Sequence, residues 1–330
     1  MAEAGGEPWL QRQPTREDVR ACYLFILGRP PEDESVLDRT VAQLRTIAEL
    51  RRRFFLSDEF RAGEPQRDAP PATLRAAGRE VESEADPEQL ARMLERTGRY
   101  WARIGKSEPW WSVLTQERFR AARIAETRGA FYQSGAVEAA LLRSILERAG
   151  LSPAALPLCV EFGCGTGRVT VHLARLFARV IGCDISVPHL ALAGRVAVQR
   201  GLGNIEWHRS TAEAPMPEAL RWDVWFSRIV LQHNPPPVIA HLLRQAFAGL
   251  APGGVAVFQV PTFRLGYSFS TADYLDNPAA PVMEMHALPQ RAVFALARQA
   301  GLEALEVLDD IQANPAQATS NIFVFRRSPA

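Results

Sequence analysis

The sequence predicts an α/β protein with a doubly wound, mostly parallel seven-stranded sheet, preceded by a small all-helical module. An apolar segment, Leu158 to Phe162, runs into a glycine-rich turn, as the first strand of such sheets does. Strand-like and helix-like apolar patterns then alternate towards the carboxyl end. Before residue 62, in contrast, apolar residues recur only at helical spacing.

Residues 1–70 are predicted to form the helical module. Its apolar residues fall in two helical runs: Val19, Tyr23, Ile26 and Leu27, then Leu37, Val41 and Leu44. Gly28 and the two prolines that follow it end the first helix, and a short helix over 50–55 comes later. Alanine, proline, arginine and glutamate dominate residues 62–86, which suits a linker.

Residues 71–150 are predicted to hold this linker and a helical lid, and residues 151–330 the main domain. The lid is rich in aromatic residues: Tyr100, Trp101, Trp110, Trp111, Phe119, Phe131 and Tyr132. We expect most of them to pack helices on the sheet, and Tyr132 and Trp111 are the main candidates for contact with a ligand.

The glycine-rich turn has the form Glu-x-Gly-x-Gly-x-Gly from Glu161 onwards. Its glycines let the backbone turn tightly against a ligand, and the next helix offers free N–H groups. A dinucleotide fingerprint requires its third glycine where this chain has Arg168. Asp184 ends the following strand, where a carboxylate can accept both hydroxyls of a ribose. The pattern therefore favours a ribose-containing ligand and disfavours a nicotinamide-dependent oxidoreductase.

The remaining elements follow in α/β order. Strands are predicted over 180–184, 205–210, 222–229, 255–260, 303–308 and 321–325. Helices are predicted through Val169, Leu173 and Leu176, from Asn234 to Leu250, and from Pro289 to Ala300. The connection from Pro261 to Pro289 is unusually long and aromatic, so we expect it to form a wall of the acceptor site.

The glycine turn, Asp184 and the Leu-x-Pro-Gly-Gly step before residue 255 resemble those of class I S-adenosylmethionine-dependent methyltransferases, over residues 151–330. The resemblance implies a sheet with an antiparallel last strand and S-adenosyl-L-methionine as the cofactor. It also implies cofactor contacts from Glu161, Phe162, Gly163, Cys164, Gly165, Gly167, Asp184, Ile185, Ser210, Thr211, Ala212, Ser227 and, in the lid, Tyr132. Glu161 is expected near the methionine ammonium and Asp184 at the ribose.

The helical module contains two further patterns, Tyr-x-x-x-Leu-Gly-Arg-x-Pro from Tyr23 and Phe-x-x-Ser-x-Glu-Phe from Phe54. Together they resemble a small helical bacterial domain that is distantly similar to phycobilisome linker modules. The resemblance leaves two roles open for the module: packing without a ligand, and contact with a partner protein.

His233 and His286 are the candidate general bases. Methyl transfer depends mainly on aligned approach of the two reactants, and an oxygen acceptor benefits from a base that removes its proton. Histidine suits this role at neutral pH. His233 follows a predicted strand at the edge that places ligands, and His286 lies in the long connection. We expect the two to face each other across the transferred methyl group.

Composition limits the partners. The 330-residue chain has a net charge of +1, so no bulk attraction for nucleic acid or anionic membranes is expected. No Asp-Pro-Pro-Tyr or Asn-Pro-Pro-Tyr motif follows the strand at 222–229, which disfavours methylation of DNA bases. The four cysteines lack metal-ligand spacing, so no metal is expected. No stretch suits membrane insertion, and the cytoplasm is the expected location.

These observations predict a bacterial methyltransferase that acts on a small molecule or glycan, with a sugar or secondary-metabolite hydroxyl as the preferred acceptor. Two alternatives stay open. The protein could bind S-adenosylmethionine without catalysis in an interaction role, or it could methylate nitrogen or carbon or transfer a different group.

Overall fold

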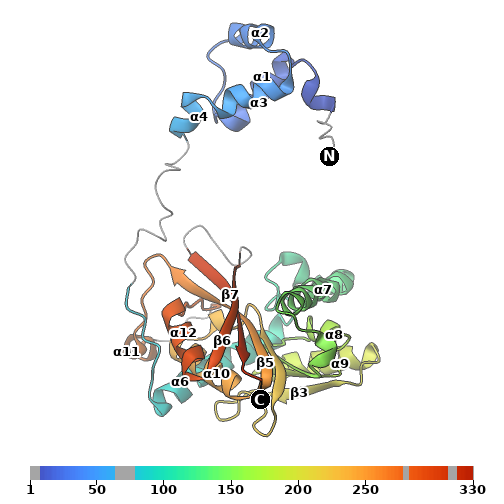
Figure 1. Ribbon diagram of the computed structural model, residues 1–330, viewed down its shortest axis with the longest axis vertical. Coiled ribbons are helices and arrows are strands. Elements are labelled where there is room, and N and C mark those ends of the chain that lie inside the picture. Colours follow the sequence, from blue (N-terminus) through green and yellow to red (C-terminus); the bar gives the residue numbers. More distant parts are fainter. Residues whose placement is uncertain (1–7, 64–78, 278–281, 311–317, 330) are drawn as a thin grey trace. The chain divides into compact units, whose positions relative to one another are not determined.

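The computed structural model describes residues 8–63, 79–277, 282–310 and 318–329. The chain divides into two compact units, Met1–Pro71 and Ala72–Ala330 (Figure 1). Much of the linker expected over 62–86, and part of the connection expected over 261–289, lie outside the described residues.

The first unit is helical, as predicted. Its elements are η1 (Pro8–Gln11), α1 (Arg16–Ile26), α2 (Glu34–Gln43), α3 (Ile47–Phe55) and α4 (Asp58–Gly63). Thr15 and Thr46 begin α1 and α3 with capping boxes, which satisfy N–H groups that the first helical turn leaves free. A small core of Val19, Leu37, Ile47, Leu50 and Phe54 holds the helices together. The likeness to phycobilisome linkers stays a prediction.

The second unit contains one seven-stranded sheet in the order β3-β2-β1-β4-β5-β7-β6. Its strands are β1 (Leu158–Phe162), β2 (Arg179–Asp184), β3 (Ile205–Arg209), β4 (Trp222–Ser227), β5 (Leu250–Arg264), β6 (Leu302–Asp309) and β7 (Ala318–Arg327). β7 pairs antiparallel with both β5 and β6, and the other pairs are parallel. The predicted sheet and its antiparallel last strand are therefore confirmed.

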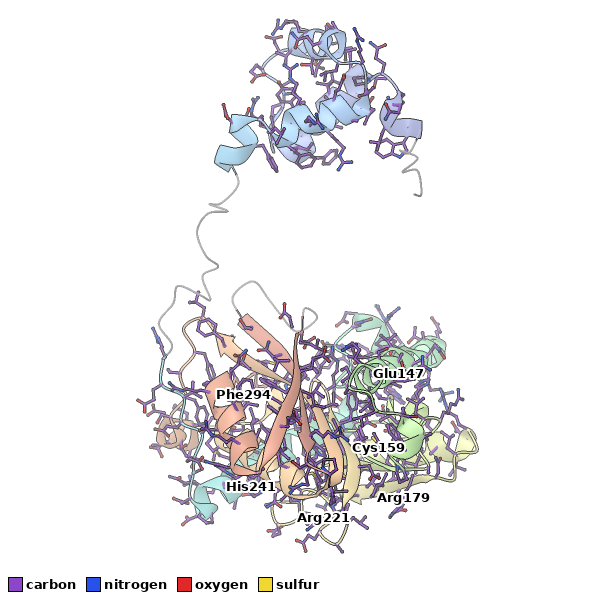
Figure 2. The ribbon with its side chains drawn as sticks, in the orientation of Figure 1. Glu147, Cys159, Arg179, Arg221, His241 and Phe294 are labelled. Carbon is purple, nitrogen blue, oxygen red and sulfur yellow. The ribbon has the colours of Figure 1, made fainter. Side chains whose placement is uncertain are left out.

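Helices cover both faces of this sheet (Figure 1). They are α6 (Pro87–Ser107), α7 (Ile124–Arg148), α8 (Thr170–Leu173), α9 (Val187–Gln199), α10 (Pro236–Ala248), α11 (Thr271–Asp276) and α12 (Gln290–Gln299), with short η2 (Glu117–Phe119), η3 (Pro153–Ala155) and η4 (Leu231–His233). Because strand side chains alternate between faces, Val160 of β1 packs towards α6, α10 and α12, and Cys159 packs towards α7. Figure 2 labels Cys159 on its strand and Phe294 on α12, whose ring packs edge-on against Phe323.

Two elements differ from the predictions. β5 extends beyond the expected strand to Arg264, because its far end pairs with β7 from Pro261 to Arg264. This pairing shortens the connection that follows. The helix expected through Val169, Leu173 and Leu176 contains only four regular residues, since N–H groups there bond to carbonyls both three and four residues back.

A candidate cofactor and acceptor pocket

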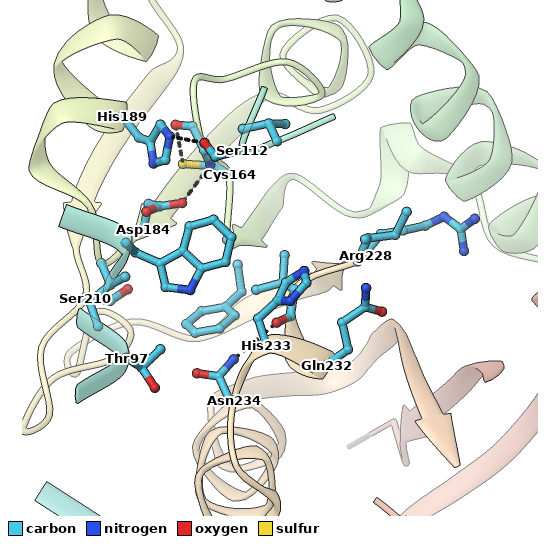
Figure 3. A pocket seen from close by; sticks show the side chains of 18 of the residues that line it. Thr97, Ser112, Cys164, Asp184, His189, Ser210, Arg228, Gln232, His233 and Asn234 are labelled. Atoms are coloured by element: carbon cyan, nitrogen blue, oxygen red, sulfur yellow. Dashed lines mark hydrogen bonds between the residues drawn. The ribbon is translucent and has the colours of Figure 1, made fainter. Parts of the chain in front are cut away.

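A cavity of about 680 Å³ opens where the carboxyl ends of β1, β2 and β4 meet the lid. Its walls come from α6, the segment after α6, the glycine turn, the ends of the strands and the connection after β5. In Figure 3 Asp184 and Ser210 lie at one side, His233 and Asn234 at the base, and Arg228 at the opposite side. This is the edge of the sheet at which doubly wound folds bind ligands.

The glycine turn fits closely between β1 and the lid. Gly163 and Gly165 have φ values of 76° and 54°, a conformation that favours glycine. A Cβ at Gly163 would lie 2.3 Å from Val230, and one at Gly165 would lie 2.8 Å from Val113. The N–H of Gly165 donates to Asp184 Oδ2 at 2.7 Å, so the acid at the end of β2 fastens the turn.

Asp184 retains capacity for a ligand. Its Oδ1 accepts one further bond, from the N–H of Ser186 at 2.8 Å, and each carboxylate oxygen can accept more than one. The side chain is only partly buried and lines the cavity. The carboxylate therefore has capacity for further donors, and its binding of a ribose stays a prediction.

Glu161 is a buried acid at the cavity wall, 5 % exposed. Its carboxylate accepts a hydrogen bond from the hydroxyl of Thr170 at 2.5 Å. Burial raises the pKa of Glu161 to about 7, because the charged form loses water, while Thr170 and the nearby positive charge of Arg168 act in the opposite direction. A cationic ligand group next to Glu161 would favour the charged form of its carboxylate.

Two arginines line the same cavity. Arg228 donates from Nε to Glu138 at 2.6 Å and from Nη2 to Asp310 at 3.1 Å. Arg168 lies farther from Glu138, at 3.9 Å, and donates from Nη1 to the hydroxyl of Ser134 at 3.2 Å. Glu138 thus bridges two buried cations beside the glycine turn.

His233 lines the cavity beside Trp101, with the two ring centroids 5.3 Å apart. Its Nδ1 lies 2.9 Å from the backbone carbonyl of Glu284. Because a carbonyl only accepts, Nδ1 carries the proton and Nε2 carries the lone pair of a base. Burial lowers the pKa of His233 to about 4, so the ring is neutral at pH 7.

His286 is not among the residues that line this cavity. Its Nδ1 lies 2.9 Å from the hydroxyl of Tyr267 and its Nε2 lies 3.1 Å from Glu284. Glu284 is itself held by Arg96 and Tyr274 at 2.8 and 2.7 Å. The expected pairing of His233 and His286 across a methyl group is therefore not the geometry observed, and His286 instead helps to fix Glu284.

The cavity brings together most of the predicted cofactor residues. Those that line it are Glu161, Phe162, Gly163, Cys164, Gly165, Asp184, Ile185, Ser210 and Thr211. Four others are not among the lining residues: Gly167, Ala212, Ser227 and Tyr132. Ser227 donates its hydroxyl to the carbonyl of Phe162, and the Tyr132 hydroxyl donates to the carbonyl of Thr166, so both support the glycine turn from behind.

Several lining residues were not predicted. They include Thr97, Trp101, Ser112, His189, Arg168, Arg228, Gln232, Asn234, Met283 and Met285. Ile229 is also in this wall and has a φ of 56°, a strained value for a β-branched residue. Its N–H donates to Gln259 Oε1 at 2.9 Å. The aromatic content of the lid was a sequence signal for Trp101, and the long connection over 261–289, which was expected to form an acceptor wall, contains Met283 and Met285.

Comparisons with known proteins agree with this geometry. Residues 159–254 match a family model described as a methyltransferase domain. The magnesium protoporphyrin IX methyltransferase of Synechocystis, solved with bound S-adenosylhomocysteine (SAH), superposes over 70 % of this chain and 97 % of its own, with a TM-score of 0.50 and 17 % identity. The region over residues 159–254 is therefore similar to a methyltransferase domain. S-adenosylmethionine is the cofactor of such domains.

Two curated relatives are similar to about half of this chain. Both are named ubiquinone biosynthesis O-methyltransferase. The one from Parvibaculum lavamentivorans is 26 % identical over 54 % of this chain and 64 % of its own length, and the one from Methylocella silvestris is 31 % identical over 52 % and 62 %. The match therefore spans less than two thirds of either relative.

Two other features bear on ligands. Within the described ranges, no group of three or more His, Cys, Asp or Glu side chains is arranged to hold a metal ion. Among the helices that the structure describes, none is long and apolar enough to cross a membrane.

Proposed function

We propose that this protein transfers a methyl group from S-adenosylmethionine to a hydroxyl group of a small molecule. The observation that carries the proposal is His233, a neutral base in the wall of the cavity that also contains Glu161 and Asp184. The cofactor supplies an electrophilic methyl group. Asp184 binds the ribose, Glu161 faces the methionine ammonium, and His233 accepts the proton of the acceptor hydroxyl through Nε2.

The acceptor side of the cavity favours a secondary-metabolite hydroxyl over a sugar. Trp101, Leu114, Met283 and Met285 give this part of the wall an apolar character. Sugars require many polar partners, whereas the amide of Asn234 is already bonded to the backbone carbonyl of Val230 at 3.2 Å. The relatives' names, which specify O-methylation, support an oxygen acceptor.

We further propose that the protein acts in the cytoplasm. We propose no nucleic-acid partner, because a net charge of +1 provides little attraction for phosphates. Contact with a partner protein is assigned to the helical module, whose Phe25 is 87 % exposed.

The proposal is tested by incubating the protein with S-adenosylmethionine and a panel of phenols, aliphatic alcohols and sugars, with mass spectrometry of the products. We expect a mass gain of one methyl group on an apolar hydroxyl compound. Binding of SAH without any methylated product would favour the non-catalytic alternative. Methylation of amines or carbon acids alone would identify a different reaction.

Two variants assign the roles of residues. Asp184→Ala removes an acceptor of two ribose hydroxyl bonds, each worth about 1.5–3 kcal/mol, so SAH affinity should fall well over tenfold. His233→Ala should lower turnover by about 10²-fold with SAH affinity unchanged. His241, a partly exposed histidine on α10 that does not line the cavity, provides the matched control as His241→Ala. Full turnover in His233→Ala would show that catalysis depends on alignment alone.

A further inference from the structure

The segment from Glu284 to His286 lies against the short helix η4, which carries His233. The backbone carbonyl of Glu284 accepts from His233 Nδ1 at 2.9 Å. Two residues later, the N–H of His286 donates to the backbone carbonyl of Gln232 at 2.7 Å. These two contacts fix the segment beside His233. Because the hydrogen bond at one ring nitrogen decides which nitrogen carries the proton, the position of Glu284 decides where His233 keeps its lone pair.

The carboxylate of Glu284 is held by three side chains. Arg96 donates from Nη2 at 2.8 Å, the hydroxyl of Tyr274 donates at 2.7 Å, and His286 Nε2 lies at 3.1 Å. Burial by itself would raise the pKa of Glu284, but these hydrogen bonds and the charge of Arg96 lower it to about 2, so the group is ionised at pH 7. Three partners around one carboxylate leave it little freedom to rotate, and the carbonyl of the same residue is held with it.

Arg96 connects this carboxylate to the lid. It lies on α6, and its side chain is 13 % exposed. Its Nη1 donates to the backbone carbonyls of Tyr274 and Asn277 at 2.8 and 3.0 Å, and its guanidinium lies over the Tyr274 ring, 3.9 Å from the centroid. Arg96 therefore joins α6 to both described parts of the connection after β5, one over 265–277 and the other over 282–289.

Arg96 is placed to act on His233 indirectly. It is not among the residues that line the main cavity. A small adjoining cavity of about 30 Å³ has Arg96, Glu284 and His233 in its wall. Any effect of Arg96 on a reaction in the main cavity would therefore pass through these neighbours and not through contact with the reactants.

We propose that Arg96 and Glu284 form a clamp that positions His233, with the proton kept on Nδ1 and the lone pair of Nε2 available to an acceptor hydroxyl. This inference rests on the proposed function. Arg96 and Glu284 are positioning residues, since they act through His233. Because the clamp begins on α6, it couples the tautomer of the base to the joining of the lid and the connection after β5.

The first measurement is the tautomer of His233. The full chain is labelled with ¹⁵N-histidine, and long-range ¹H–¹⁵N spectra at pH 7 distinguish protonated from unprotonated ring nitrogens. The His233 signals are those that disappear in His233→Ala. We expect the Nδ1–H form alone in the parent protein and a mixture with the Nε2–H form in Arg96→Met. An Nε2–H form in the parent, or parent signals in Arg96→Met, would overturn the proposal.

The second measurement is turnover with the acceptor that the panel identifies. Arg96→Met should lower kcat about tenfold, the effect of one charge-assisted hydrogen bond, with SAH affinity unchanged. Glu284→Gln should act in the same direction, and the double variant should be no slower than the slower single variant, because both remove one interaction. Arg96→Lys keeps the charge and should restore part of the turnover. Arg99→Met is the matched control, since Arg99 is exposed on α6 and pairs with Glu95, and it should change neither tautomer nor kcat.

A variant that fails to fold is recognised by its loss of SAH binding, and Glu284→Gln, which keeps the side-chain volume, then carries the test. Lower turnover with an unchanged tautomer would mean that Arg96 only stabilises the fold, and it would refute the clamp. Failure of the proposed function has a different signature. A parent protein that methylates no hydroxyl, but whose His233 changes tautomer in Arg96→Met, would support the clamp and refute the proposed reaction.

Discussion

At the scale of a single residue, Glu161 makes the stability of the fold depend on pH. Burial raises its pKa to about 7 in the folded protein, above the ordinary value of 4.5. Below pH 4.5 both the folded and unfolded states hold the proton. As pH rises towards 7 the unfolded state ionises first, so the free energy of unfolding falls by up to about 3 kcal/mol and the loss is complete above pH 7. Urea unfolding of the parent and Glu161→Gln between pH 5 and 8 measures this difference.

The cofactor should reverse this penalty. An ammonium group near Glu161 favours the carboxylate, so SAH binding below pH 7 should release a proton and weaken as pH falls. Calorimetry at pH 6 in two buffers of different ionisation enthalpy detects the proton. Glu161→Gln should release none from this position, and equal release by parent and variant would contradict the assignment.

At the scale of elements, α7 controls the position of the glycine turn through Gly135. A Cβ at Gly135 would lie 2.0 Å from the backbone carbonyl oxygen of Arg168, whereas one at Gly129 on the same helix would meet nothing within 4 Å. Gly135→Ala should therefore destabilise the fold by at least about 1–3 kcal/mol and weaken SAH binding, because backbone must move. Gly129→Ala should stabilise it by about 0.5–1 kcal/mol, as alanine favours helix. Chemical denaturation of both variants tests this, and equal stabilities would show that α7 does not press on the turn.

At the scale of the whole molecule, the cavity belongs to the second unit. All its lining residues lie between Leu94 and Met285, within Ala72–Ala330. Removal of residues 1–71 should leave the melting temperature of the second unit and its SAH affinity unchanged. A deeper truncation to Pro87 removes Glu82, which accepts from the N–H of Thr271 at 2.7 Å, and should destabilise the connection after β5. Loss of SAH binding in the first truncation would make the helical module part of the catalytic core.

The elements that were predictable share a physical basis. Alternating apolar residues predict strands, and apolar residues at helical spacing predict helices. Glycines and acids at the ends of strands indicate a ligand-binding turn. These are local patterns, so the strands, the glycine turn and the acid at the end of β2 could be inferred from the sequence, whereas the antiparallel last strand was implied by the resemblance to a family. The extent of β5 could not, because its end pairs with β7 more than fifty residues later. His286 was also a candidate base, because the sequence alone does not show that the hydroxyl of Tyr267 lies against its ring.

The finer chemistry of the pocket depends on contacts between distant segments. Glu138 of α7, Arg168 of the turn and Arg228 after β4 meet only when the sheet and its helices have packed. His233 obtains its tautomer from a carbonyl fifty-one residues away, and burial then keeps it neutral. Charge, desolvation and hydrogen bonding act through space, whereas sequence patterns report neighbours along the chain. The sequence therefore indicates the class of cofactor, and the packed structure supplies the protonation states and the charge pairs that distinguish one subsite from another.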